Sequence, residues 1–402
     1  MTIHPVLSEV RLGALRLRNR AVVAPMSRVS TAGDGVPTAA MAEYYTRFAA
    51  GGFGLITTEG TYTDAEFSQA YPDQPGIVTG RQIEGWRAVT GAVHAAGGAI
   101  ALQLMHAGAL LQGNRHSGGS IAPSAVQPKG VKMSSYGGGD GPFAVPVAAT
   151  HADIRRILGG FAAAAERARL AGFDAVEIHG ANGYLIDQFL TDYTNRRDDE
   201  YGGDPAGRVR FAVEVVEAVR AAVGPKFPVG LRLSQTKVND SAYRWSGAAE
   251  AATIFRAVGA AGVDYLHLAS EGRDWSETAV LDTGDTITRV ARSVTGLPVI
   301  ANGGMHGPDL ARTVLDDGHA DLVALGRGAL ANPDWPQVVA EGYRPVEFDR
   351  AMLAAGVTLD GQRSWEEARN GEIPVVNGNP HGAPGARSKA VHRVGSSTRN
   401  VI

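Results

Sequence analysis

Short apolar runs alternate with longer Ala-rich segments of helical periodicity along most of this 402-residue chain. Continuous apolar runs are typical of strands that helices cover on both faces, as in parallel sheets. The predicted strands are residues 21–24, 55–59, 99–104, 175–179, 228–234, 265–269, 298–301 and 322–326. The predicted helices between them include residues 81–96, 153–171, 207–223, 247–260, 285–294 and 307–317. Eight strands with intervening helices predict an α/β fold, the (β/α)8 TIM barrel.

Three segments depart from this alternation. Residues 7–18 alternate apolar and polar side chains around a Gly-Ala pair, which predicts a hairpin that plugs the closed end of the barrel. Residues 106–150 follow the third strand and are rich in Gly, Ser and Pro, so we expect this long segment to cap the open face. The tail from about Gly356 has almost no apolar periodicity, which is typical of disorder or of an arm across a partner subunit. The predicted organisation is a barrel at 1–345 and a partly irregular or subunit-contacting extension at 346–402.

Composition and charge exclude several classes of function. The formal net charge of −3 gives no electrostatic case for nucleic acid or an anionic membrane. The absence of cysteine excludes disulfides, thiolate zinc sites and cysteine-ligated iron–sulfur clusters. No apolar run approaches the roughly 20 residues that span a bilayer, and the first ten residues lack the layout of a signal peptide. We expect a cytoplasmic enzyme that acts on a small molecule without a metal ion.

Glycine-rich turns follow the seventh and eighth predicted strands. They read IANGG at 300–304 and LGRG at 325–328. Barrels commonly bind phosphate at this position, because glycines let backbone N–H groups approach the anion and an arginine can grip it. Arg327 is the candidate arginine. Many barrels share this feature, and the chain has 52 glycines, so these turns indicate phosphate without specifying flavin.

Polar side chains follow the fourth predicted strand. His179, Asn182 and Tyr184 lie within six residues, directly after a buried apolar run. A histidine and an asparagine at one strand mouth can both donate hydrogen bonds to the same oxygen. A tyrosine, whose ordinary pKa is about 10, is protonated at neutral pH and can act as a proton donor. The plainer alternative is a structural histidine at a strand end.

Polar or small residues also end four other strands. They are Pro25-Met26-Ser27 after the first, Glu59-Gly60 after the second, Gln103 in the third and Arg232 in the fifth. Taken singly, Gln103 is explained as a turn cap and Arg232 as a buried ion-pair partner. Taken together, and with the HxxNxY cluster and the FLTDYTNRRDDEYGG segment that follows it, they form an ordered set of motifs.

This ordered set resembles the Old Yellow Enzyme family of FMN-dependent ene-reductases over roughly residues 5–340. The resemblance implies one non-covalent FMN. It assigns the flavin ring edge, pyrimidine end and phosphate to Ala24, Pro25, Met26, Ser27, Gly60, Gln103, Arg232, Asn302, Gly303, Gly304, Gly326 and Arg327. It assigns His179 and Asn182 to the substrate oxygen and Tyr184 to proton donation, and it places Val29 over the substrate, where some members carry an aromatic residue.

The function implied by the resemblance is reduction of the C=C bond of α,β-unsaturated carbonyl or nitro compounds, with NADH or NADPH, in a ping-pong reaction. The same barrel also serves oxidative enzymes such as N-demethylases or desaturating oxidoreductases, and this alternative stays open. A flavin-free phosphate-binding barrel, acting as an isomerase or lyase, is the alternative from another class. Ser27 stands where relatives often carry threonine or cysteine, and Met105 where a yeast-like branch carries tryptophan, so the substrate is left open.

Several further residues receive structural interpretations. His267 lies inside an apolar run and is predicted to be a satisfied core residue, and His106 to shape the floor of the site. The acidic residues of the segment after the fourth strand are predicted to be caps and surface ion pairs. They are Asp187, Asp198, Asp199 and Glu200. The residues predicted to hold that long loop in place are Asn195, Arg197 and Tyr201.

Overall fold

The computed structural model describes residues 3–270 and 275–371, and eight parallel strands in it close into a barrel. In chain order the barrel strands are β3 (Ala21–Val23), β4 (Leu55–Thr57), β6 (Ile100–Met105), β9 (Ala175–Asn182), β10 (Val229–Lys237), β11 (Tyr265–Leu268), β12 (Val299–Asn302) and β13 (Leu322–Leu325). Each strand pairs with the next in parallel register, and β13 pairs with β3 to close the ring. The predicted (β/α)8 barrel is confirmed, and the predicted strand ends lie within three residues of the observed ones.

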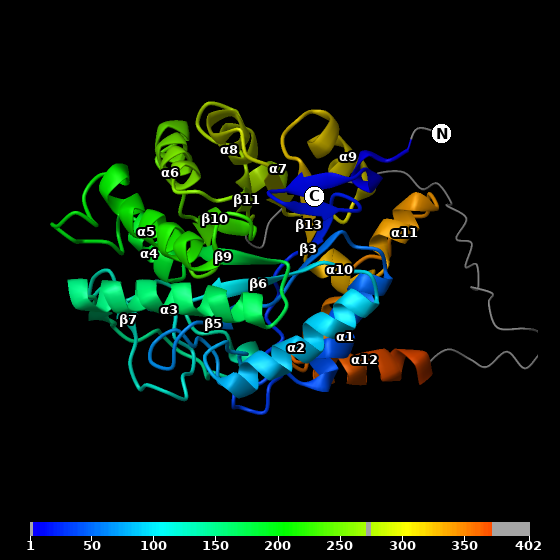
Figure 1. Ribbon diagram of the computed structural model, residues 1–402, viewed down its shortest axis with the longest axis horizontal. Coiled ribbons are helices and arrows are strands. Elements are labelled where there is room, and N and C mark those ends of the chain that lie inside the picture. Colours follow the sequence, from blue (N-terminus) through cyan, green and yellow to red (C-terminus); the bar gives the residue numbers. More distant parts are fainter. Residues whose placement is uncertain (1–2, 271–274, 372–402) are drawn as a thin grey trace, which may run out of the picture.

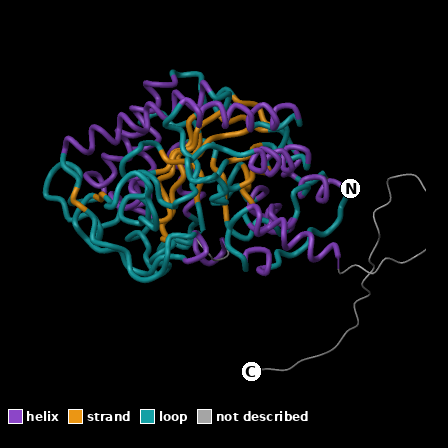
Figure 2. The backbone as a smooth tube through the Cα atoms, turned by 90° about the horizontal axis from the view of Figure 1, so that it is seen from below, coloured by secondary structure: helices purple, strands orange, loops and turns teal. Residues whose placement is uncertain are grey.

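Helices surround these strands, which lie in the centre of the molecule (Figures 1 and 2). The main helices are α1 (Ala39–Ala50), α2 (Gly80–Ala95), α3 (His151–Leu170), α5 (Pro205–Val223), α6 (Ala248–Ala260), α8 (Ile287–Thr295) and α9 (Pro308–Asp316). Shorter helices are α4 (Leu185–Leu190), α7 (Trp275–Thr278), α10 (Arg327–Ala331) and α11 (Trp335–Ala340). Threonine side chains cap several helix starts: Thr79 and Thr150 each form a capping box with the residue three positions later. The sequence did not predict α1, although a Thr38 cap begins it.

The N-terminal hairpin closes one end of the barrel, as predicted. Strands β1 (Val10–Leu12) and β2 (Leu15–Leu17) pair antiparallel after the short helix η1 (Pro5–Leu7). Leu12 and Leu17 are fully buried and pack with Leu55, Ala101 and Leu322 in the barrel interior. These three partners lie at or near the starts of their strands, so the hairpin plugs the amino-terminal end and leaves the carboxyl-terminal end for chemistry.

The segment after β6 forms the predicted cap. It contains two short strands, β7 (Ile121–Ala122) and β8 (Val147–Ala148), which pair with each other, and the 3-10 helix η2 (Ser134–Tyr136). A further short strand, β5 (Thr61–Tyr62), extends the sheet beside β6. Arg197 ties the cap to the loop after β9, because its guanidinium donates to the carbonyl oxygens of Pro123 (3.1 Å) and Ala149 (2.5 Å).

The C-terminal segment returns to the carboxyl-terminal end of the barrel, where its residues join those of the cap. It includes the 3-10 helix η3 (Arg350–Leu353) and the helix α12 (Leu359–Gly371), which lies beside α1 (Figure 1). Arg28 holds this segment, since its Nη2 donates to the Gln362 side chain (2.8 Å) and the Thr358 carbonyl (3.1 Å). The chain is therefore helical beyond Gly356, where the sequence indicated irregular structure; the rest of that prediction lies outside the described residues. In the described part of the chain, no helix has the length and apolarity needed to cross a membrane.

The plug generates a first prediction. Leu17→Ala removes a buried side chain from the barrel interior and should lower the free energy of unfolding by about 2–5 kcal/mol. Urea denaturation measures this change, and Arg11→Ala, on the exposed side of the same hairpin, should change it by less than about 0.5 kcal/mol. Equal effects of the two substitutions would show that the hairpin does not belong to the core.

Candidate active site

A cavity of about 510 Å³ opens at the carboxyl ends of the barrel strands. Its size suits a small molecule or cofactor. All twelve predicted cofactor residues line it: Ala24, Pro25, Met26, Ser27, Gly60, Gln103, Arg232, Asn302, Gly303, Gly304, Gly326 and Arg327. The three predicted catalytic residues, His179, Asn182 and Tyr184, line it as well. Side chains that are more than 300 positions apart in the sequence therefore meet in one site.

Val29 is the predicted site residue that does not line this cavity. It is 5% exposed and packs behind the wall with Met105 and Tyr184. Its φ of 37° is unusual for a β-branched residue, and the buried Glu59 carboxylate holds this backbone by accepting the N–H groups of Arg28 (2.8 Å) and Val29 (2.9 Å). The structure thus places Val29 in the wall that supports the cavity and not at the surface of the cavity.

One end of the cavity is built from backbone and a cationic side chain. Gly303 and Gly304 both have positive φ, 133° and 67°. A Cβ on Gly303 would lie 2.7 Å from the Ser270 Cβ, so no larger residue fits there without a shift. Exposed Arg327 contributes the positive charge on the same wall. These groups suit a phosphate, as the sequence predicted.

A buried polar network forms the inner wall at the other end. Gln103 Nε2 donates to Glu177 (2.9 Å), and Glu177 accepts from His267 Nδ1 (2.8 Å). Arg232 contacts His267 Nε2 (2.6 Å) and donates to the Asn302 side chain (2.9 Å). Burial alone would raise the pKa of Glu177, but His267 and Arg232 lower it below its usual value, while burial and Arg232 lower the pKa of His267. The network is therefore an ionised carboxylate, a neutral imidazole and a guanidinium, and the prediction that His267 is a satisfied core residue is confirmed.

The proposed substrate residues lie at the end of β9 and in the turn that follows it. Burial, and then the charge of Arg232, lower the pKa of His179 to about 3, so this imidazole is neutral and one ring nitrogen donates. Two buried atoms here, His179 Nδ1 and Asn182 Oδ1, have no hydrogen-bond partner in the described protein. Asn182 adopts a left-handed conformation (φ 68°), and its N–H donates to Ser234 Oγ (2.9 Å). Unpaired buried polar atoms beside a cavity are what a missing ligand leaves.

Tyr71 does not line the cavity but contacts Tyr184 and Tyr136, which do, and the sequence did not reveal this supporting role. Its hydroxyl is hydrogen-bonded to that of Tyr184, and its ring stacks on Tyr136 of the cap at 4.6 Å between centroids. Ser27 also hydrogen-bonds Tyr71, whose pKa burial raises above its ordinary value. Tyr71 lies in an irregular loop after β5, where neither periodicity nor a motif distinguishes it.

The cap and the C-terminal segment complete the cavity wall. The lining residues from these segments include Met133, Tyr136, Phe348, Arg350, Leu353 and Val357. The two segments meet where the Val357 N–H donates to the Ser135 carbonyl (3.3 Å). The sequence placed residues after 345 outside the barrel, yet they contribute directly to the site. Only the return of the chain in three dimensions reveals this contribution.

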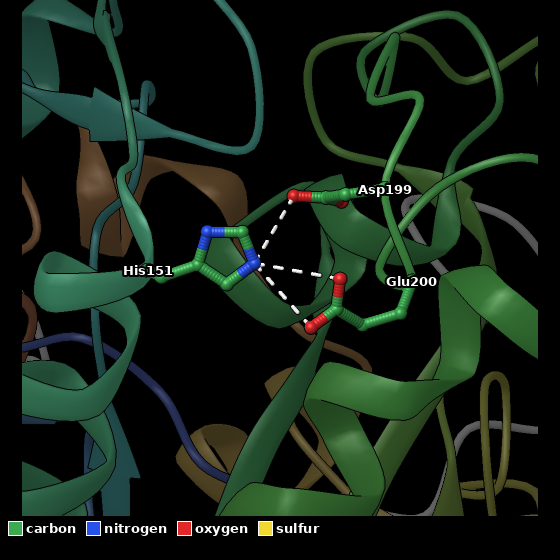
Figure 3. Close-up of side chains that lie close together, drawn as sticks. All are labelled: His151, Asp199 and Glu200. Atoms are coloured by element: carbon green, nitrogen blue, oxygen red, sulfur yellow. Dashed lines mark hydrogen bonds and ion pairs between the residues drawn. The ribbon is translucent and has the colours of Figure 1, made fainter.

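The loop after β9 is held as predicted by Asn195 and Arg197. Asn195 Nδ2 donates to the Phe189 and Tyr201 carbonyls, each at 2.7 Å. Beside them, His151 Nε2 lies 3.5 Å from Asp199 and 3.3 Å from Glu200 (Figure 3). Arg197 already pairs with Asp199, so this cluster is a partly exposed ion-pair group that fastens α3 to the loop.

Asp187 corrects the prediction of a surface ion pair. It is fully buried in α4 and forms an ion pair with Lys237, which is 1% exposed, at 2.5 Å. Asp198 in the same segment is exposed, as expected. Sequence alone does not separate these acids, because the buried partner of Asp187 is Lys237, which lies 50 positions further along the chain.

Comparison with known proteins agrees with this geometry. Residues 7–345 match the model of the NADH:flavin oxidoreductase / NADH oxidase family. The chain is 35% identical to a flavin oxidoreductase of Emericella nidulans, over 87% of this chain and 94% of that protein. It is 34% identical to 12-oxophytodienoate reductase 2 of Arabidopsis thaliana, over 83% and 87% of the two chains.

Solved structures show the same relationship. An Old Yellow Enzyme homologue from Zymomonas mobilis superposes with a TM-score of 0.76 at 32% identity, covering 85% of this chain and 94% of that one. Morphinone reductase in complex with tetrahydroNAD superposes with a TM-score of 0.75 at 34% identity, covering 86% and 93%. The chain belongs to the Old Yellow Enzyme family. It is an NAD(P)H:flavin oxidoreductase whose cofactor is non-covalent FMN.

Glu59 generates a prediction about pH. Burial raises the pKa of this carboxyl to about 7, above its value in the unfolded chain, so the stability it contributes at low pH is lost as pH rises through 7. Glu59→Gln keeps an oxygen for the two N–H groups and cannot ionise. The free energy of unfolding of the variant, relative to the parent, should therefore rise between pH 5 and pH 8 by up to about 3 kcal/mol. Urea denaturation across this range measures it, and a pH-independent difference would refute the shift.

Proposed function

We propose that the protein reduces the C=C bond of α,β-unsaturated carbonyl or nitro compounds with NADH or NADPH. The observation that carries this proposal is the arrangement of His179, Asn182 and Tyr184 at one cavity wall, with an unpaired buried ring nitrogen on His179. A substrate oxygen bound there would withdraw electrons from the alkene. The membership of the family and the resemblance to 12-oxophytodienoate and morphinone reductases support the same reaction class.

The cavity fits FMN at both ends. Gln103 and Arg232 would face the pyrimidine end of the ring, and the backbone at residues 302–304 with Arg327 would hold the phosphate. Bound FMN supplies the hydride chemistry, since it takes a hydride from the nicotinamide and passes it to an acceptor. Arg232 is fixed by His267 and Asn302, so its positive charge is preorganised for the electron-rich reduced ring.

The side chains around the substrate would polarise it and protonate it. His179 is neutral and can donate one N–H to the substrate oxygen, and the Asn182 amide can donate a second hydrogen bond. These donors make the β-carbon electrophilic. Tyr184 would then give its hydroxyl proton to the α-carbon, and Tyr71, hydrogen-bonded to Tyr184, would keep that hydroxyl in place.

The cap and the C-terminal segment limit access to one side of the site. Met133 and Tyr136 come from the cap and Leu353 and Val357 from the C-terminal segment, and they form the wall on that side of the cavity. A site with a single open side supports a ping-pong sequence, in which the nicotinamide leaves before the alkene enters.

The reaction is tested by anaerobic absorbance spectra of the purified protein. A flavin spectrum should appear, bleach on addition of NADPH or NADH, and return when 2-cyclohexenone is added. A flavin that bleaches and ignores enones and nitroalkenes would refute the proposal. Reduction of that flavin by an N-methyl amine would favour the oxidative alternative instead.

Tyr184 gives the sharpest single change. Tyr184→Phe removes the proposed proton donor while keeping the ring that packs against His179. Flavin reduction by nicotinamide should be unchanged within about twofold, and the alkene half-reaction should slow by about 10²–10⁴-fold. Stopped-flow absorbance measures both half-reactions in the same variant, and flavin reduction by the nicotinamide is the control for the alkene half-reaction. Equal slowing of the two would contradict the assigned role.

A further inference from the structure

A buried ion pair lies directly behind the turn that carries the proposed substrate residues. Asp187 in α4 and Lys237 at the end of β10 are 0% and 1% exposed, and their charged atoms are 2.5 Å apart. Lys237 Nζ also lies 4.6 Å from the centre of the Tyr243 ring. Charges are rarely buried, and a buried ion pair is weak evidence for stability because desolvation offsets the attraction. A role in fixing a particular conformation is the better explanation to test.

The conformation in question is the turn at residues 182–184. Asn182 and Gly183 both have positive φ, 68° and 89°, a left-handed conformation that glycine and asparagine adopt more readily than other residues. A Cβ on Gly183 would lie 2.4 Å from Asn239 Oδ1, so a larger residue would both strain the backbone and displace Asn239. This turn points Asn182 and Tyr184 into the same cavity from nearby backbone positions. Hydrogen bonds to Ser234 and Asp187 fix the turn at the point where it departs from the extended backbone of β9.

The ion pair contacts this turn through the Asp187 carboxylate, and the backbone of the strand that carries Lys237 pairs with it. Asp187 uses one carboxylate oxygen for Lys237 and the other to accept the Gly183 N–H at 2.7 Å. Lys237 is the backbone partner of Asn182 across the sheet, and the following Val238 N–H donates to the Asn182 carbonyl (3.3 Å). Asp187 therefore holds Gly183, which lies between the proposed substrate donor and the proposed proton donor, while the backbone at the end of β10 holds Asn182.

We propose that Asp187 and Lys237 are positioning residues, which fix the 182–184 turn so that Asn182 and Tyr184 meet the substrate. The Asp187–Gly183 hydrogen bond is the direct link, and Lys237 orients the Asp187 carboxylate by binding its other oxygen. This inference rests on the proposed function for the identity of the ligand that Asn182 binds. It adds a second layer of residues that contact neither substrate nor flavin.

The test separates the hydrogen bond from the charges with two double variants of matched size. Asp187→Asn/Lys237→Met removes both charges and keeps an oxygen that accepts the Gly183 N–H. Asp187→Leu/Lys237→Met removes the same charges and the acceptor. Both lose the contact of Lys237 with Tyr243, so this loss cancels in the comparison. Asp187→Ala/Lys237→Met is a second acceptor-free variant, in case leucine packs poorly.

The readout is the dissociation constant of 4-hydroxybenzaldehyde, a phenol whose oxygen imitates the substrate carbonyl. Binding is monitored through the change in flavin absorbance. FMN content and melting temperature are measured alongside. The variant with asparagine should bind the phenol within about twofold of the parent, and the acceptor-free variants about tenfold more weakly at unchanged FMN content. His179→Ala, which removes a proposed donor directly, is the positive control.

Equal phenol affinity in all the double variants would overturn the positioning role and leave the pair as a structural feature. A melting temperature that falls equally in the asparagine and leucine variants, without a difference in phenol affinity, would overturn it in the same way. A failure of the proposed function gives a different result, because enones would then not reoxidise the reduced flavin of the parent protein. Steady-state data supply a second readout, because loss of positioning should lower kcat for the enone as well as raise KM.

Discussion

Closure of the sheet is the constraint on which the rest of the structure depends. Hydrogen bonds between β13 and β3 complete a ring of parallel strands, so all eight carboxyl ends share one rim. The plug fills the opposite end with Leu12 and Leu17, which leaves that rim as the place where polar side chains can surround a ligand. Residues from the first strand to the last then line one cavity, although they come from segments far apart in the sequence.

Within the rim, buried polar groups set the electrostatics. Glu177 is ionised because His267 and Arg232 stabilise its charge, and Arg232 in turn is held beside the cavity. His179 is neutral because burial and the nearby guanidinium both disfavour its protonation. One cation thus performs two tasks: it provides a fixed charge at the proposed flavin end, and it keeps the imidazole in the form that donates a single hydrogen bond.

The polar residues at the end of β9 show how much of the site a local sequence pattern can predict. His179, Asn182 and Tyr184 fall together because they are neighbours at one strand end, and the glycine turns after β12 and β13 are recognisable from composition. Tyr71, Met133 and Val357 carry no such pattern, because irregular loops bring them to the site. Val29 was expected at the substrate surface and lies in the supporting wall, where the buried Glu59 accepts its N–H, and no local pattern in the sequence predicts this contact.

The sequence by itself determined the barrel, its plug and the set of strand-end residues, because period, glycine position and chain order are local properties that strands and helices express directly. Tertiary structure decided what surrounds them. The burial of Asp187 with Lys237, the pairing of Tyr71 with Tyr184, and the return of the C-terminal segment over the cavity all join residues far apart in the chain. Such contacts depend on the free energy of packing and desolvation in the closed barrel. That free energy arises between segments, so the sequence of one segment does not predict it.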